Sequence, residues 1–171
     1  MIRKTLALIL LASGSLFLGH AQVNTVSQAQ SMFIYNFSRL IQWPASYNTG
    51  EFVIGVIGNN DLRNTLASYV ANKKVGSQPI TVKSFNNADE ISKCHILFVG
   101  NAKVGQLSEI VSNVQSFNSL IITERKGMVE SGSAIDFFME GDKLKFVMNT
   151  QNAQKYDLVV SKSLSDMAYN D

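Results

Sequence analysis

The feature that most constrains the fold is the alternation of short, strand-like runs with segments of helical period. Two of the runs, FVIGVIG and CHILFVG, are strongly apolar and end in glycine. Strands that alternate with helices are typical of a parallel sheet covered on both faces. We therefore predict an α/β fold with three layers, Rossmann-like, around a mostly parallel central sheet. The predicted strands are residues 51–58, 78–85, 94–100 and 119–124, and the predicted helices between them are 59–74, 104–115 and a short turn or helix at 87–92.

The pattern changes after residue 133, where apolar and polar residues alternate with a period of two. Ile135, Phe137 and Met139 share one face, and Leu144, Phe146 and Met148 follow the Glu140–Asp142 turn. This pattern predicts a β-hairpin, antiparallel to the rest of the sheet and at its edge. A short helix, a short strand and a terminal helix are expected after it, and residues 22–171 form one domain.

The first 21 residues have the composition of a signal peptide. Arg3 and Lys4 precede an apolar run over residues 6–18, and Gly19-His20-Ala21 ends it as a small-x-small site. We expect cleavage after Ala21 and a periplasmic protein. The segment carries two of the 15 basic residues and none of the 13 acidic ones, so the mature chain has 13 of each. This balance argues against a nucleic-acid partner, and no second long apolar run indicates a membrane-embedded segment.

The segment FIYNFSRLIQWP begins the mature fold as a helix over about residues 26–42. Phe33, Phe37, Leu40 and Ile41 form its predicted packing stripe, and Trp43-Pro44 ends it because proline disfavours helix before itself. Asn36 borders this stripe. An amide buried there needs hydrogen-bond partners, so we expect it to bond the backbone near a strand end or the hairpin.

Residues for catalysis are few. The mature chain has one cysteine, Cys94, and one histidine, His95. Neighbours on a strand point to opposite faces, so the two cannot form a thiolate–imidazole pair. We expect Cys94 to be buried and His95 to pack with a hydrogen bond at the rim. No zinc-ligand set or phosphate-binding motif is present, and we predict no enzyme activity, no cofactor and no metal.

Polar residues gather where predicted strands end, the usual place of a crevice in an open α/β sheet. Asn59, Asn60 and Asn101 follow two strands, and Glu124, Arg125 and Lys126 follow another. One interpretation is a recognition surface. The alternative is that the amides cap helices and form turns while the charged run is a solvated loop.

The order of several segments resembles the YfiR-like periplasmic proteins over residues 30–168. The matching pieces are N-F-x-x-x-I-x-W-P, C-H-I-L-F and K-F-x-x-N. The residues that carry these motifs, expected to be structural, are Tyr35, Asn36, Phe37, Trp43, Pro44, Cys94, His95, Phe146 and Asn149.

The resemblance implies a non-enzymatic regulator, in some relatives a dimer. Its expected partner is the periplasmic part of a membrane-anchored diguanylate cyclase or sensor kinase, so that it acts on cyclic-di-GMP and biofilm formation. Redox sensing by an internal disulfide, found in relatives, does not carry over because Cys94 has no partner in the chain. The alternatives are a periplasmic small-ligand sensor beside Asn59, Asn101 and Arg125, and a hydrolase or transferase that would need His95 exposed beside a carboxylate.

Overall fold

The structure, a computed structural model, describes residues 25–169; the predicted signal peptide lies outside them. Five α-helices and nine strands are present in this range, with four 3-10 turns. The helices are α1 (Val26–Leu40), α2 (Asn60–Val70), α3 (Leu107–Asn113), α4 (Thr150–Gln154) and α5 (Lys162–Met167). The 3-10 turns are η1 (Ala45–Tyr47), η2 (Ala88–Glu90), η3 (Val104–Gln106) and η4 (Met128–Ser131). The strands are β1 (Ile41–Gln42), β2 (Phe52–Ile57), β3 (Lys74–Val75), β4 (Gln78–Phe85), β5 (Ile96–Val99), β6 (Leu120–Thr123), β7 (Ile135–Glu140), β8 (Lys143–Met148) and β9 (Val159–Val160).

The core is a curled sheet of seven strands in the order β3-β4-β2-β5-β6-β7-β8. Strands β4, β2, β5, β6 and β7 run parallel, and the two edge strands β3 and β8 are antiparallel to their neighbours. The mixed α/β class and the mostly parallel sheet are thus confirmed. The hairpin prediction needs one correction: β7 is parallel to β6, and only β8 reverses. The arrangement in three layers stays a prediction.

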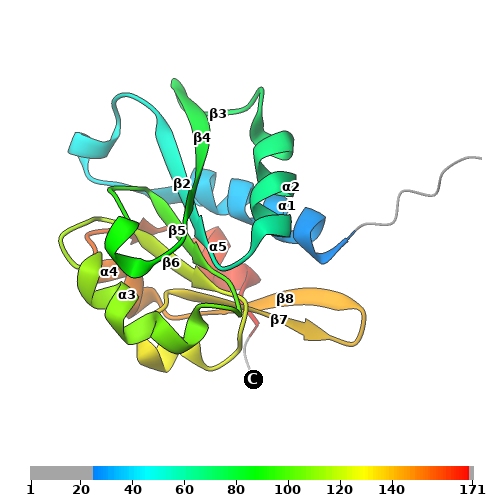
Figure 1. Ribbon diagram of the computed structural model, residues 1–171. Coiled ribbons are helices and arrows are strands. Elements are labelled where there is room, and N and C mark those ends of the chain that lie inside the picture. Colours follow the sequence, from blue (N-terminus) through cyan, green and yellow to red (C-terminus); the bar gives the residue numbers. More distant parts are fainter. Residues whose placement is uncertain (1–24, 170–171) are drawn as a thin grey trace, which may run out of the picture.

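Helices α1 and α2 pack against each other on one side of the molecule, and α3 lies away from this pair against η2 and η3 (Figure 1). The buried stripe of α1 differs from the predicted one. Ile34, Phe37 and Ile41 are fully or almost fully buried, whereas Phe33 and Leu40 are half-buried. The packing face is therefore rotated, and Asn36 falls on the exposed side of the helix. The expectation that Asn36 is an amide bordering the core was wrong.

Four phenylalanines join α1 to the hairpin. Phe37 lies 5.0 Å from Phe146 and 5.9 Å from Phe137, measured between ring centroids, and Phe33 lies 5.7 Å from Phe146. Aromatic pairs at these separations add about 0.5–1.5 kcal/mol each beyond their burial. This cluster fixes the hairpin against α1.

A second, two-stranded sheet joins the two ends of the domain. Helix α1 ends at Leu40, earlier than predicted, because Ile41 and Gln42 pair antiparallel with Val160 and Val159. The backbone amide of Ser161 also donates to the Leu40 carbonyl at 3.0 Å. Trp43 then packs edge-on against Phe52, and its indole N–H donates to the His95 carbonyl at 3.1 Å.

Candidate functional site

The predicted polar surface at the strand ends is organised around one carboxylate, Glu124. Its Oε2 accepts from the Asn59 side-chain amide at 2.8 Å and from the Gln30 amide at 3.5 Å, and its Oε1 accepts from the Asn101 backbone N–H at 2.6 Å. Asn59, Asn101 and Glu124, which sequence reasoning placed on one edge, are thus brought together. Because the Glu124 carboxylate already accepts from these donors, an anionic ligand would have to displace it.

Asn59 has a second role as the N-cap of α2. Its side-chain oxygen accepts from the Leu62 N–H at 2.9 Å, which supplies one of the partners that a helix N-terminus needs. The N-cap of α2 is therefore Asn59, and Asn60 lies exposed in the first turn of the helix. The capping alternative from the sequence is confirmed for Asn59.

Of the other two members of the predicted surface, Lys126 points elsewhere. Arg125 and Lys126 are exposed, and the Lys126 ammonium lies 4.9 Å from the Phe138 ring centroid and 5.3 Å from that of Tyr169. Lys126 therefore belongs with the hairpin and the C-terminal segment, not with Asn59 and Asn101. The surface predicted as one unit divides into two.

A buried carboxylate that sequence reasoning missed, Asp136, holds the loop between β6 and β7. Asp136 is fully buried and accepts from Thr123 Oγ1 at 2.7 Å, from the Val129 N–H at 2.8 Å and from Ser133 Oγ. Hydrogen bonds of this kind offset the cost of burying a charge. In the alternating hairpin pattern Asp136 reads as solvent-facing, so the sequence offered no signal for its burial.

Asn152 ties the same loop to α4. Its side-chain amide donates to the carbonyls of Val129 and Ser133 at 2.6 and 2.8 Å. Asn149, a family-motif residue, caps α4 by accepting from the Asn152 N–H at 3.2 Å. Both residues therefore act on the position of the loop that carries Glu124, Arg125 and Lys126.

His95 and Cys94 are both buried, at 5% and 1% exposure. The Val53 N–H donates to His95 Nδ1 at 3.1 Å, so the ring proton sits on Nε2, which donates to the Tyr47 carbonyl at 3.0 Å. The histidine lies within the core, not at the rim as expected. Burial, with the nearby Lys93 charge, lowers the pKa of His95 despite these hydrogen bonds.

The Cys94 thiol lies 3.7 Å from Ser119 Oγ, and burial raises its pKa to about 11. The thiolate is the reactive form of cysteine, so this residue is a packed apolar side chain at neutral pH. Its predicted burial is confirmed.

Tyr35 lies on the surface shared by α1 and α2. Its ring meets Tyr69 edge-on at 6.1 Å between centroids, with Lys73 Nζ 5.4 Å and Arg39 Cζ 5.7 Å from its centroid. Pro44, half-buried, precedes η1. The ring contacts of Tyr35 belong to the packing of α1 against α2.

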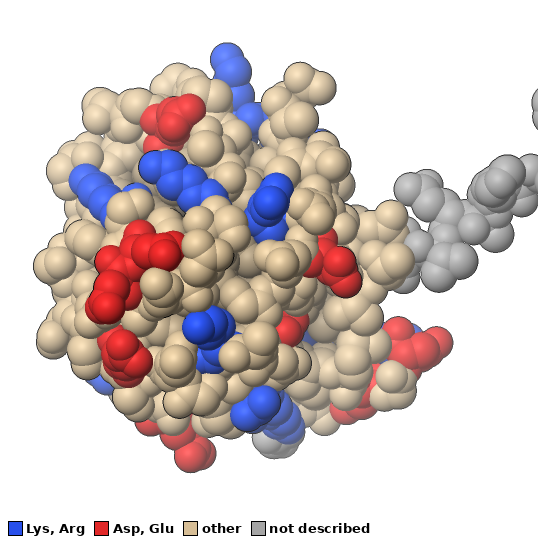
Figure 2. All heavy atoms as spheres, in the orientation of Figure 1, with Lys and Arg blue, Asp and Glu red and all other residues tan. Residues whose placement is uncertain are grey.

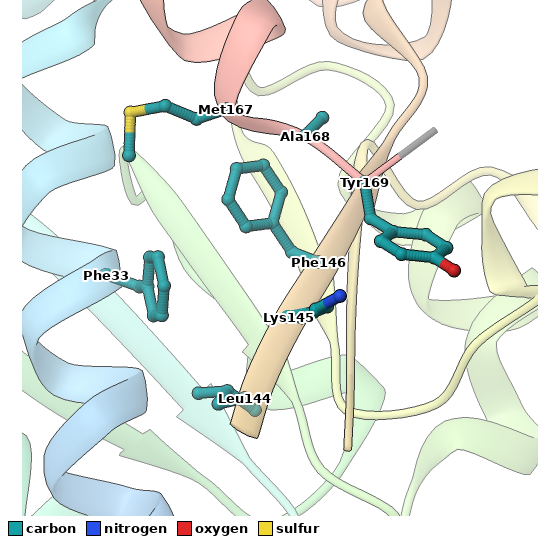
Figure 3. A pocket seen from close by; sticks show the side chains of 7 residues that line it. All are labelled: Phe33, Leu144, Lys145, Phe146, Met167, Ala168 and Tyr169. Carbon is teal, nitrogen blue, oxygen red and sulfur yellow. The ribbon is translucent and has the colours of Figure 1, made fainter. Parts of the chain in front are cut away.

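An open hollow, the hairpin cavity, lies between α1, β8 and the C-terminal segment (Figure 3). Its volume is about 510 Å³. Most of its walls are apolar, and Lys145 is the one charged residue among them. The lining residues are Phe33, Leu144, Lys145, Phe146, Met167, Ala168 and Tyr169.

A smaller recess of about 150 Å³ adjoins the hairpin cavity, because Leu144 lines both. Val26 and Met139 are at its rim and are each 46% exposed, while Met167 at the rim of the cavity is 51% exposed. Gln30, Asn101 and Glu124 form its polar end. Large exposed apolar side chains around a hollow are typical of interaction sites. Elsewhere both signs of charge are interspersed on the face in Figure 2, in line with the 15 basic and 13 acidic residues of the sequence.

Within residues 25–169, no helix has the length and apolar character needed to cross a membrane. The same range brings no three His, Cys, Asp or Glu side chains together as a metal-binding group. The geometry is that of an α/β domain whose polar strand-end groups bond one another and whose open hollow is mostly apolar.

A model of the YfiR/HmsC-like family matches residues 27–169. The chain therefore belongs to the YfiR/HmsC-like family, a family of periplasmic regulatory proteins, as the motifs predicted. A comparison with curated proteins finds no significant match.

Two solved structures share the fold. One is a conserved domain protein from Vibrio cholerae, with a TM-score of 0.58 at 9% identity, covering 81% of this chain and 58% of that one. The other is described as an ABC domain in complex with L-Trp from Streptococcus, with a TM-score of 0.56 at 15% identity, covering 83% and 59%. The chain thus spans about three fifths of the length of each. At these identities the likeness concerns the fold alone.

Proposed function

We propose that this protein is an exported, non-enzymatic regulator. It binds the periplasmic part of a membrane-anchored signalling protein, a diguanylate cyclase or a sensor kinase, and thereby changes cyclic-di-GMP signalling and biofilm formation. Family membership supports regulation outside the cytoplasm. The specific partner and the signal are part of the proposal.

The observation that carries the proposal is the hairpin cavity with its rim of exposed apolar side chains. Met167 beside this cavity and Val26 and Met139 beside the adjoining recess are about half exposed, and methionine adapts its shape to a partner. The candidate polar groups, by contrast, are occupied by one another around Glu124. We therefore place partner binding at the hairpin cavity.

Regulation by binding needs only a difference in affinity for two states of the partner. If the cavity fits the inactive state better, binding shifts the partner towards it by that difference in free energy. No bond is made or broken, and no catalytic group in the regulator is required.

The test is complementation of a gene deletion, read as intracellular cyclic-di-GMP and surface attachment. Deletion should change both, and the wild-type gene should restore them. Met167→Glu, which puts a charge at the cavity rim, should fail to restore them. Met32→Glu is the matched control, because Met32 is an equally exposed methionine (50%) that lines neither hollow. An unchanged cyclic-di-GMP level after deletion, with the membrane partner present, would contradict the proposal.

A second candidate function is the sensing of a small molecule in the hairpin cavity. Its volume lies within the roughly 300–1,000 Å³ typical of ligand sites, and its walls include three aromatic side chains. The structurally similar Streptococcus domain is described in complex with L-Trp. A thermal-shift screen of aromatic metabolites separates the two functions, because a ligand that binds the native state raises the melting temperature. Stabilisation that Met167→Glu removes would favour sensing.

A further inference from the structure

The outer edge of β8 has backbone groups that face away from the sheet. β8 is the last strand, and its pairing with β7 opposes Phe137 to Phe146 and Met139 to Leu144. The Tyr169 N–H donates to the Phe146 carbonyl at 2.8 Å, so the backbone groups of Phe146 point outward. Alternate residues of an antiparallel strand share this direction, so the N–H and C=O of Leu144 point outward too. Among residues 25–169, neither group of Leu144 has a backbone partner.

The C-terminal residues already use this edge. After α5 ends at Met167, the backbone of Ala168 is extended, and the Tyr169 N–H makes one backbone hydrogen bond to β8. The Tyr169 ring packs edge-on against Phe138 at 5.3 Å between centroids. We call residues 168–169 the strap. The strap shows that the edge accepts extended backbone, and Leu144, one rung further along, is open.

The two faces of β8 differ in character at this edge. Leu144 and Phe146 turn towards the hairpin cavity with Phe33 and Met167 (Figure 3). Lys145 also lines the cavity, but its side chain turns the other way, towards the C-terminal segment: its Nζ lies 4.5 Å from the centroid of the Tyr169 ring and is paired with Glu140. Side chains alternate between faces, so exposed Lys143 lies on the lysine side as well.

We infer that the β8 edge receives an extended segment of the regulated partner by strand addition. The segment has alternating apolar and acidic side chains and displaces the strap. This inference rests on the proposed function and specifies how the partner is recognised. Main-chain bonds to Leu144 and Phe146 supply affinity, and alternate side chains supply specificity. The apolar residues enter the hairpin cavity, and the acidic residues meet Lys143 and Lys145.

Charge argues for a partner segment and against a second copy of this chain. Antiparallel pairing of β8 with itself, centred on Leu144 or Lys145, places lysine directly opposite lysine on one face. Like charges in directly opposed positions destabilise a pair of strands. Carboxylates on a partner segment, placed opposite Lys143 and Lys145, would turn this repulsion into attraction.

The experiment uses the mature protein, purified from the cell envelope after export. The probe is a short, end-blocked peptide of alternating leucine and glutamate. Its controls are a peptide of the same composition with the two residue types in separate blocks, and an alternating leucine–lysine peptide. Binding is measured by fluorescence anisotropy, and amide hydrogen exchange is followed by NMR.

Strand addition predicts that the alternating acidic peptide binds and slows exchange of the Leu144 N–H. The Lys145 N–H faces β7 and should not change. Binding of the block or lysine peptide with equal affinity would overturn the inferred specificity. Binding without protection of Leu144 would overturn strand addition in favour of a helix or a side-chain contact.

Displacement of the strap has its own test. Tyr169→Ala removes the ring that anchors the strap and should tighten peptide binding about tenfold, as expected from the loss of one aromatic contact. Tyr35→Ala, at the distant α1–α2 surface, should leave the affinity unchanged. Weaker binding by Tyr169→Ala would show that the strap is part of the binding surface and not its competitor.

The failure of this inference is distinguishable from failure of the proposed function. If no peptide binds while Met167→Glu still abolishes regulation in cells, strand addition is wrong and the regulatory function stands. If Met167→Glu regulates normally, the placement of binding at the hairpin cavity is wrong.

Discussion

At the residue scale, Glu124 shows how a charged side chain in a surface loop can be structural. It accepts from an asparagine side chain, a glutamine side chain and a backbone N–H that come from three separate parts of the chain. Sequence reasoning found the edge on which these groups meet, because strands of a parallel sheet end together. It could not find that one of the groups satisfies the others, because that depends on side-chain reach.

We expect Glu124→Ala to destabilise the protein by about 1–3 kcal/mol, because it leaves the Asn59 amide and the Asn101 N–H without their acceptor. Urea unfolding measures the change. Glu130→Ala, at an exposed position in the same loop, is the control and should change the free energy of unfolding by less than about 0.5 kcal/mol. Equal effects of the two substitutions would contradict the role of Glu124.

Because His95 is buried, we expect the free energy of unfolding to depend on pH. Its folded pKa lies below the ordinary value, since burial disfavours the charged ring, and a proton on Nδ1 would oppose the Val53 N–H. The stabilisation is therefore fully present above the unfolded pKa of about 6.5 and is lost as pH falls towards the folded pKa.

Urea unfolding between about pH 7.5 and pH 5, a range that spans the ordinary histidine pKa, should show this loss as a fall in the free energy of unfolding. The signal is simple to assign because the other histidine, His20, lies in the predicted signal peptide. His95→Asn should flatten the dependence in this window. An equally steep dependence in His95→Asn would assign the loss to other groups.

At the scale of elements, periodicity predicted the major strands and helices with small errors at their ends. The two-residue strand β1 was not predicted, because a strand of that length has no period, whereas β9 lies where a short strand was expected after the hairpin. The rotation of α1 has a related cause: Phe33, Ile34, Phe37, Leu40 and Ile41 are all apolar, so the pattern allows several packing faces. The contacts of Phe37 with Phe137 and Phe146 select one of them.

Gly58 and Gly100, which follow β2 and β5, lie in close contact with each other. A Cβ added at Gly100 would lie 2.4 Å from the Gly58 carbonyl oxygen, which is backbone and cannot rotate away. Gly100→Ala should therefore destabilise the protein by about 1–3 kcal/mol. Gly105→Ala, where a Cβ meets nothing within 4 Å, is the matched control. Urea unfolding measures both, and a neutral Gly100→Ala would mean that the strand ends separate easily.

At the scale of the whole molecule, the first and last elements of the described residues 25–169 are parts of one structure. β9 pairs with β1, Leu164 of α5 is fully buried, and the Tyr169 N–H bonds β8. We expect removal of residues 159–171 to abolish cooperative unfolding. It exposes core surface worth about 1.5–3 kcal/mol for Leu164 alone, against a total stability of about 5–15 kcal/mol. Circular dichroism during heating checks this, with removal of residues 170–171 as the control.

The antiparallel pairing of β1 with β9 has a consequence for the order in which parts of the fold can form. A chain that enters a new compartment from its N-terminus presents Ile41 and Gln42 early and Val159 and Val160 only near the end of its passage. Contacts between such distant positions form late. For the exported protein proposed above, the β1–β9 pairing is therefore among the last contacts that can form.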